Sequence, residues 1–224
     1  MRWLYLNSGP GGAALNMAID EALLEQSSTL CSAVFRLYGW TEPAASFGYF
    51  QRYQDVEQLT ALRPLVRRPT GGGIVPHDAD WTYSLAFPPA HAWYDLSARD
   101  SYCRVHQWIQ AAFQAVGIPA ELAPAAFKPL AGQCFVGHEQ SDLLWRGRKI
   151  AGAAQRRRKD GLLIQGSVQP PASIERSKWE LAMLEAGSKI HAAEWAPCPD
   201  NALLDRAAEL AQAKYGQAAY NQQR

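Results

Sequence analysis

Residues 67–78 read Arg-Arg-Pro-Thr-Gly-Gly-Gly-Ile-Val-Pro-His-Asp, and they run into the strand-like residues 81–87. Three consecutive glycines carry no Cβ atoms, so a ligand can approach the backbone N–H groups of Gly71, Gly72 and Gly73 closely. The adjacent Arg67 and Arg68 can hold a carboxylate or a phosphate with forked hydrogen bonds. The alternative is a glycine-rich turn beside a solvated pair of arginines. The interpretation of the fold starts from this segment.

The glycines form neither of the common phosphate-binding loops. No Gly-Lys-Ser/Thr follows them at Walker spacing, and no Gly-x-Gly-x-x-Gly opens a helix. His77 and Asp78 suit either orientation of a substrate or closure of the loop by hydrogen bonds. The chemistry of the segment therefore depends on residues from elsewhere in the chain.

Length and charge indicate a globular protein with no polyelectrolyte partner. The chain has 224 residues, enough for one real core, and 22 basic against 21 acidic residues, so neither nucleic acid nor a membrane surface is expected as partner. Four cysteines show no CxxC pairing and no zinc spacing, which predicts no metal site and a reduced setting. With no export signal and no membrane-spanning run, we expect a soluble cytoplasmic protein.

The order of expected elements favours a mixed α+β fold. Alternating apolar residues predict strands at 2–6, 33–38, 65–68 and 81–87, and an antiparallel meander over 142–168. Helical spacing predicts helices at 14–26, with Asp20, Glu21 and Glu25 on the polar side, and at 102–116, capped by Asp95 or Ser97. We expect one domain over 1–224, with a helical C-terminal extension over 172–224.

Lys149 is the second candidate for chemistry. It lies on an expected strand next to Ile150, Ala151 and Gly152. Pointing inward, its ammonium would be partly desolvated and able to polarise a carbonyl or hold a phosphate. Pointing outward, it would be a solvated hairpin lysine.

Cys134 is the third candidate, with His138 four residues on. A thiolate nucleophile needs a nearby cation or base to lower its pKa, and His138 or Lys149 suits that task. An inert small hydrophobe is the alternative. The basic run 156–159 is interpreted either as a solvated turn or as a rim that attracts an acidic protein partner.

Together these segments resemble the catalytic domain shared by lipoate-protein ligases, octanoyltransferases and biotin-protein ligases. The resemblance covers most of residues 3–170 and rests on ordered motifs. They are Asn16-Met17-Ala18-Ile19-Asp20-Glu21-Ala22-Leu23, Arg36 to Tyr38 with Trp40 followed by Ser46-x-Gly48-x-x-Gln51, Arg67-Arg68-x-Thr70-Gly71-Gly72-Gly73-x-Val75-x-His77-Asp78, and Asp142-Leu143-Leu144-x-x-Gly147-Arg148-Lys149-Ile150-Ala151-Gly152-x-Ala154-Gln155-Arg156.

The resemblance implies a central, mostly antiparallel sheet flanked by helices and an acyl-binding loop at residues 67–78. It further implies substrate binding by Arg67, Arg68, Thr70, Gly71, Gly72, Gly73, His77, Asp78, Gly152 and Ala154. The pattern is closest to the octanoyltransferases of the amidotransferase-like branch, whose Cys-Phe pair matches Cys134-Phe135. Such an enzyme takes an octanoyl group from acyl carrier protein onto the cysteine and passes it to a lysine of a lipoyl domain or an H-type protein of glycine cleavage, without a cofactor. Both carrier domains are typically acidic, which would give Arg67, Arg68, Arg148 and the run 156–159 a docking role.

Two alternatives stay open at this stage. An ATP- and Mg-dependent lipoate ligase makes an acyl-adenylate in the same cleft and uses no cysteine, but it commonly carries an accessory domain for which the C-terminal extension looks too short. The other alternative is a protein that binds lipoyl domains or free acyl groups without catalysing a reaction. The pattern departs from the family at Gln165, where the family often has His before Gly-Ser/Thr, and at Pro76, where an aromatic residue is more usual.

Overall fold

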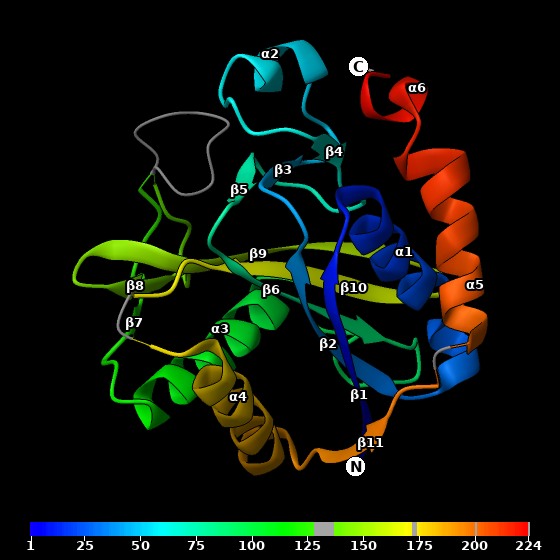
Figure 1. Ribbon diagram of the computed structural model, residues 1–224. Coiled ribbons are helices and arrows are strands. Elements are labelled where there is room, and N and C mark those ends of the chain that lie inside the picture. The colour runs from blue at the N-terminus through cyan, green and yellow to red at the C-terminus, as the bar shows by residue number, and fades with distance from the viewer. Residues whose placement is uncertain (128–136, 172–173, 200, 224) are drawn as a thin grey trace.

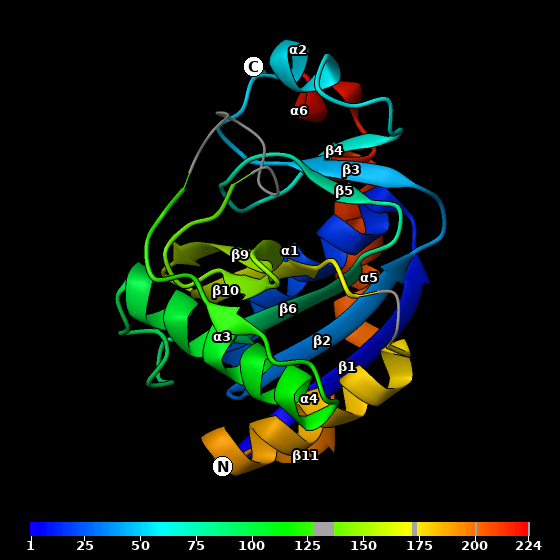
Figure 2. The same ribbon diagram turned by 90° about the vertical axis from the view of Figure 1, so that its left-hand side faces the viewer.

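A computed structural model describes residues 1–127, 137–171, 174–199 and 201–223. Within these residues, eight strands form a large mixed sheet and three form a small one (Figure 1). Helices flank the large sheet, and the small sheet lies above one end of it (Figure 2). The mixed α/β architecture expected from the sequence is therefore confirmed.

The large sheet has the spatial order β11–β1–β2–β6–β10–β9–β8–β7. The pairs β11–β1 and β1–β2 are parallel, and all pairs from β2 to β7 are antiparallel. The meander expected at 142–168 is β8–β9–β10. In chain order the strands are β1 (Arg2–Gly11), β2 (Ala33–Trp40), β6 (Trp81–Phe87), β7 (Glu121–Leu122), β8 (Leu143–Trp145), β9 (Arg148–Arg158), β10 (Gly161–Val168) and β11 (Glu194–Pro197).

Each face of the large sheet has its own apolar cluster. Helices α3 (Ala98–Ala115) and α4 (Arg176–His191) pack on one face. Helices α1 (Ala13–Leu30) and α5 (Asn201–Leu210) pack on the other. The hydroxyl of Ser97 accepts the Asp100 N–H and caps α3, as one of the two expected caps.

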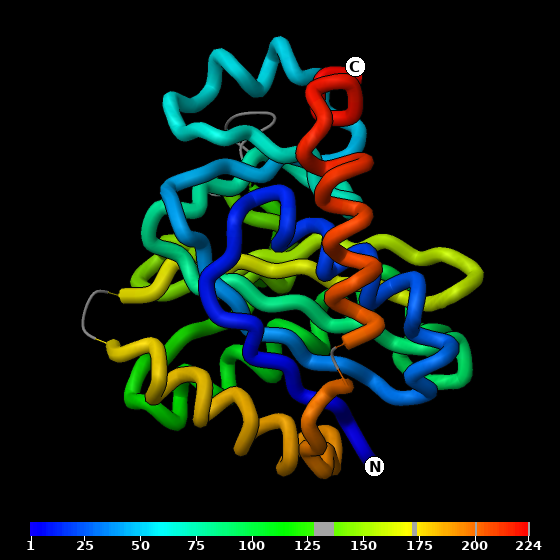
Figure 3. Tube along the Cα trace, turned by 45° about the vertical axis from the view of Figure 1, so that its right-hand side comes forward, coloured from blue at the N-terminus to red at the C-terminus, as the bar shows by residue number. Residues whose placement is uncertain are grey.

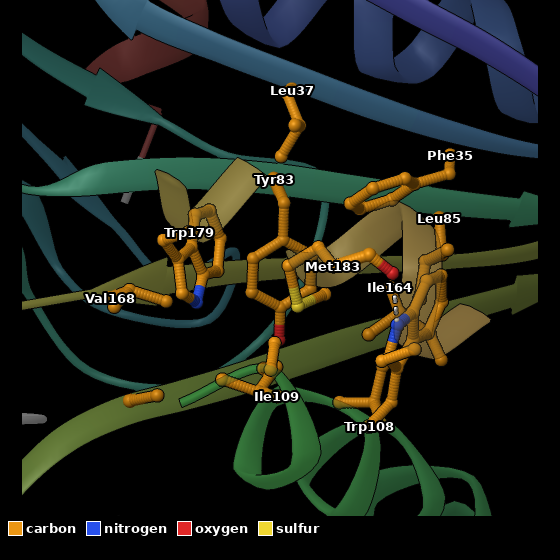
Figure 4. Packing of buried hydrophobic residues seen from close by; sticks show 14 of the residues in the cluster. Phe35, Leu37, Tyr83, Leu85, Trp108, Ile109, Ile164, Val168, Trp179 and Met183 are labelled. Carbon is orange, nitrogen blue, oxygen red and sulfur yellow. Dashed lines mark hydrogen bonds between the residues drawn. The ribbon is translucent and has the colours of Figure 1, made fainter. Parts of the chain in front are cut away.

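The α3–α4 side is an apolar core, in which the Trp108 indole N–H donates to the Met183 carbonyl at 2.7 Å (Figure 4). Each large side chain buried there contributes roughly 1.5–3 kcal/mol. Phe35 and Leu37 of β2, and Tyr83 and Leu85 of β6, project into this core. Because side chains alternate along a strand, the even-numbered residues of β2 and β6 face the opposite side. Several of those residues are polar.

The polar side predicted for α1 is buried at two of its three acidic residues. Asp20 and Glu21 are 0% and 2% exposed. The helix is enclosed because α5 and the π-helical turn η1 (Ala211–Tyr215) cover the side turned away from the sheet, as the tube in Figure 3 shows. Both carboxylates have cationic partners: Arg36 lies 2.6 Å from Asp20, and Lys214 contacts Glu21. Only Glu25 keeps a partly open position, paired with Arg206.

The C-terminal segment is mostly helical and packs against the rest of the chain. Strand β11 pairs with β1, α4 packs on α3, and α5 packs on α1. The last helix, α6 (Ala218–Asn221), reaches the small sheet and contacts β4 (Figure 3).

The small sheet has the order β4–β3–β5, with β4 (Leu65–Arg67), β3 (Ala44–Phe47) and β5 (Val75–His77). Strands β3 and β4 are parallel, and β3 and β5 are antiparallel. The glycine loop connects β4 to β5, and the short helix α2 (Tyr53–Glu57) lies in the connection between β3 and β4. The segment that opened the sequence interpretation therefore forms much of the small sheet.

Candidate active site

Two rows of polar side chains cross the face of the large sheet that α1 covers. Neighbouring strands are in register, so residues at the same level point the same way. One row is Arg36, Ser84 and Gln165, and the other is Tyr38, Thr82 and Ser167, on β2, β6 and β10. On β9 the rows continue with the small residues Ala154 and Gly152, which leave open space above the sheet.

This open space is a pocket between the two sheets. It holds about 490 Å³ of empty volume, including the part open to solvent. Side chains of the large sheet, including those of β9, form its floor. The small sheet and the glycine loop form its roof. The lining residues are Met17, Tyr38, Ser46, Arg68, Gly72, Val75, His77, Thr82, Lys149, Gly152, Ala153, Ala154, Gln165, Gly166 and Ser167.

Arg68 shapes the glycine loop. Its guanidinium donates to the Gly71 carbonyl at 2.6 Å and to the Gly73 carbonyl at 2.8 Å. The loop lies so close to the preceding turn that a Cβ atom on Gly48 would stand 1.9 Å from the Gly72 carbonyl oxygen. Arg68 is 5% exposed and lines the pocket, so it is a buried part of the loop and not a solvated cation.

Arg67 points away from the pocket. Its side chain is 0% exposed, lies over the Phe47 ring, and donates to the carbonyl of Tyr49 at 2.8 Å and of Asn221 at 2.9 Å. Its backbone N–H donates to the Asn221 side chain at 2.8 Å. Arg67 therefore ties α6 to the small sheet, and the structure does not place it with the pocket residues.

Gln165, at the position where the family often has histidine, joins the loop to α1. Its amide donates to Asp20 Oδ2 at 2.7 Å, and its carbonyl oxygen accepts the Thr70 hydroxyl at 2.7 Å. The Asp20 carboxylate also accepts hydrogen bonds from the side chains of Arg36, Tyr38 and Ser84. The sequence interpretation missed this hub. Arg36, a lone charge in an otherwise apolar strand, was its signal, because a charge buried there needs a partner.

A second hydrogen-bonded chain runs along the roof of the pocket. The Ser46 hydroxyl lies 2.8 Å from His77 Nε2, and His77 Nδ1 lies 2.8 Å from Asp80 Oδ2. Trp40 stacks on the His77 ring with centroids 3.8 Å apart. All three polar residues are buried, and Ser46 and His77 line the pocket. Only His77 was predicted from the sequence; Ser46 lies in a quoted motif, and Asp80 gave no signal of its own.

Lys149 lines the pocket and its side chain is buried against a carboxylate. Its Nζ is 2.7 Å from Asp142 Oδ2, and the two side chains are 7% and 0% exposed. Asp142 also accepts the Tyr102 hydroxyl and the Glu139 N–H. Burial, with Asp142 nearby, raises the pKa of Tyr102 well above its ordinary value, so this hydroxyl stays protonated and keeps donating. Because the Lys149 side chain is buried and paired with Asp142, it is not the solvated hairpin lysine of the alternative interpretation.

The Lys149 side chain packs against the backbone of Gly152. A Cβ atom there would stand 2.6 Å from Lys149 Cε and 2.7 Å from Nζ. The lysine therefore crosses the space that any other residue at 152 would occupy. Behind this cluster, burial lowers the pKa of His106 on α3 to about 4, so the ring is neutral near pH 7.

The structure places the other predicted residues in different positions relative to the pocket. Gly72, Gly152 and Ala154 line the pocket with Arg68, His77, Lys149 and Gln165, whereas Asp78 is exposed and Thr70, Gly71 and Gly73 belong to the loop behind the lining. His138 lines a neighbouring hollow that also includes Lys149 and Phe127. Cys134 lies outside the described residues.

All three arginines in the run 156–159 bond to other parts of the protein, and Arg157 donates to the Leu96 carbonyl. Arg156 donates to the Pro69 carbonyl at 2.9 Å, and Arg158 pairs with Glu21 at 2.9 Å. Arg157 and Lys159 are exposed. In the part of the chain that the structure describes, no cluster of three or more metal-ligating side chains occurs. No helix among the described residues is long and apolar enough to span a membrane.

The fold of the chain matches that of solved lipoate-protein ligases. A solved lipoate-protein ligase A bound with ATP superimposes with a TM-score of 0.80 at 19% identity, covering 99% of this chain and 98% of that one. A bipartite lipoate protein ligase from Thermoplasma acidophilum, solved in a study with its E2 lipoyl domain, gives 0.75 at 19% identity, covering 99% and 95%.

The chain belongs to the lipoyl protein ligase A/B catalytic domain family, which matches residues 12–176. Octanoyltransferase LipM of Halalkalibacterium halodurans is 36% identical over 179 residues, covering 74% of this chain and 65% of that protein. The chain spans just under two thirds of the length of such relatives. The family resemblance inferred from the sequence motifs is confirmed.

Proposed function

We propose that this protein transfers an octanoyl or lipoyl group to a lysine of an acceptor protein, through a thioester on Cys134. The proposal rests on the buried Lys149–Asp142 ion pair, whose lysine lines the same pocket as Met17, Val75 and the small residues Gly152 and Ala154. Relatives named octanoyltransferase LipM, at 34–36% identity, support the transfer of an octanoyl group.

The chemistry takes place in two balanced steps. In the first, the Cys134 thiol gives up its proton and attacks the thioester carbonyl of octanoyl-acyl carrier protein; the C–S bond to the carrier breaks, and the carrier leaves as a thiol with that proton. In the second, the neutral amine of the acceptor lysine attacks the new thioester, the C–S bond to Cys134 breaks, and the proton lost by the amine restores the Cys134 thiol. No ATP is consumed, because the energy of the thioester drives the formation of the amide.

Lys149 serves both steps by stabilising charge. Negative charge builds on the carbonyl oxygen as each nucleophile attacks, and one well-placed donor is worth roughly 2.7–4 kcal/mol. Asp142 and Tyr102 hold the ammonium in place, so little reorganisation is needed in the transition state. The glycine loop, held by Arg68, positions the acyl chain.

We propose acyl carrier protein as the donor and a lipoyl domain or an H-type protein of glycine cleavage as the acceptor, in the cytoplasm. The exposed cations Arg148, Arg157 and Lys159 supply positive charge for docking acidic carrier domains. Arg67 and Arg68 are buried and engaged with carbonyls, so we assign them no docking role.

The test is an ATP-free incubation of the wild-type protein with octanoyl-acyl carrier protein, followed by peptide mass spectrometry. We expect an octanoyl adduct on Cys134 that is discharged by adding a lipoyl domain. Cys134→Ser should lose both adduct and transfer, whereas the matched control Cys31→Ser, which changes an exposed cysteine, should keep them.

Three results would contradict the proposal. Transfer by Cys134→Ser at the wild-type rate would eliminate the thioester. Strict dependence on ATP with release of AMP would establish an ATP- and Mg-dependent ligase instead. Binding of a lipoyl domain without turnover, with Lys149→Ala affecting affinity alone, would establish a silent binder.

A further inference from the structure

We propose that Ser46, His77 and Asp80 form a second nucleophilic centre in this pocket, one that hydrolyses medium-chain acyl esters and thioesters. The class of substrate rests on the proposed function, because the same pocket would take the acyl chain. The nucleophile and its activation rest on the hydrogen-bond geometry of these three residues.

The sheet register brings serine and histidine together. Ala44 of β3 pairs with His77 of β5, so Ser46, two residues along, points to the same face as His77. That face is the roof of the pocket. Ser46 Oγ lies 2.8 Å from His77 Nε2, within reach for proton transfer.

Asp80 fixes the proton on the correct ring nitrogen. A carboxylate can only accept, so the N–H of neutral His77 is on Nδ1 and donates to Asp80 Oδ2 at 2.8 Å. His77 Nε2 then carries the lone pair that accepts the Ser46 proton. Ser167 and Thr82 also donate to Asp80 Oδ2, at 2.7 and 3.1 Å, which anchors the carboxylate. This is the division of roles in a serine–histidine–aspartate triad.

A buried cation lies beside the serine. Arg68 Nη1 is 3.3 Å from Ser46 Oγ, and the guanidinium lines the pocket. A positive charge there favours the developing alkoxide and the tetrahedral oxyanion. A purely structural link between β3 and β5 would need no access to the pocket, yet both Ser46 and His77 line it.

Hydrolysis needs no reactant other than the ester or thioester and water. Ser46 Oγ loses its proton to His77 Nε2 and attacks the acyl carbonyl, forming a C–O bond. The C–S or C–O bond to the leaving group breaks as His77 returns the proton to it. Water then attacks the acyl-serine, gives a proton to His77, and the fatty acid leaves as Ser46 regains its proton.

The experiment uses Cys134→Ala as the parent protein, so that no acyl group can pass through that thiol. Two readouts are taken: hydrolysis of p-nitrophenyl octanoate above the buffer rate, and labelling by an alkyl fluorophosphonate located by peptide mass spectrometry. We expect the parent to hydrolyse the ester and to carry the label on Ser46. Adding Ser46→Ala should lower hydrolysis about 100-fold or more and abolish the label.

Controls separate loss of the nucleophile from loss of the fold. Ser27→Ala in the same parent removes a buried hydroxyl that bonds only to the Leu23 carbonyl in the described structure, and should leave both readouts unchanged. Ser46→Cys keeps a nucleophile of similar size, and its alkylation by iodoacetamide should slow when His77→Gln is added.

A parent protein that is unlabelled at Ser46, or equal hydrolysis with and without Ser46, overturns the triad. Alkylation of Ser46→Cys at the same rate with and without His77 overturns it as well. None of these outcomes bears on the Cys134 adduct, which is measured in the wild-type protein with its thioester donor.

Discussion

Replacing Gly152 with alanine would test whether the position of the Lys149 ammonium governs acyl transfer. The added Cβ atom would stand 2.7 Å from Nζ, and ordinary contact begins at 3.4 Å, so the ammonium must move by about 0.7 Å. At an effective dielectric constant of about 20, moving the ammonium from about 2.7 to about 3.4 Å from the negative charge that it stabilises costs ~1.3 kcal/mol. This cost corresponds to about a tenfold lower rate. Misplacement of a whole ångström costs about 100-fold.

We therefore expect Gly152→Ala to transfer octanoate about 10- to 100-fold more slowly than wild type, with a folded structure. The assay is single-turnover transfer from octanoyl-acyl carrier protein to a lipoyl domain, with thermal unfolding followed in parallel. Gly12→Ala is the matched control, because a Cβ atom there meets nothing within 4 Å. Wild-type transfer by Gly152→Ala would refute the role given to the lysine, since its ammonium cannot stay in place beside the new methyl group.

Three further predictions concern the scaffold. Arg67→Ala should lower the free energy of unfolding by about 2–4 kcal/mol and speed hydrogen exchange over 216–223, because Arg67 ties α6 to the small sheet; unchanged exchange there would contradict that anchor. Gln165→Leu should raise KM more than it lowers kcat, since Thr70 and Asp20 lose the side chain that joins them; an equal loss in kcat and kcat/KM would instead place Gln165 in the transition state. For His106 the folded pKa of about 4 lies below the ordinary 6.5, so the unfolded chain binds the extra proton first: stability is complete above about pH 6.5 and falls as the pH drops towards 4, by about 3 kcal/mol, and His106→Leu should flatten this slope in urea titrations at several pH values.

Local patterns in the chain determined its elements and its family. The alternation in Trp81–Phe87 predicts β6, and the 3–4 spacing around Trp108 predicts α3, because an element must bury its apolar face. The strand predicted at 2–6 extends through Ser8-Gly9-Pro10 to Gly11, since pairing with β2 resumes after an irregularity between Asn7 and Pro10. Ordered motifs over most of the chain gave the family, and with it Lys149 and the glycine loop.

Only the tertiary structure decided which polar residues meet. Asp20 was expected on the polar side of its helix, but α5 and η1 enclose that helix, and the buried carboxylate becomes the hub for Arg36 and Gln165. Arg67 and Arg68 are neighbours in sequence with the same chemistry, yet one anchors α6 and the other shapes the glycine loop. Ser46 and Asp80 are separated from each other by 33 intervening residues of sequence and joined through His77 by the register of β3 and β5. Apolar periodicity is a local property of the chain, whereas a hydrogen bond between distant residues depends on how whole elements pack, and no local pattern encodes that packing.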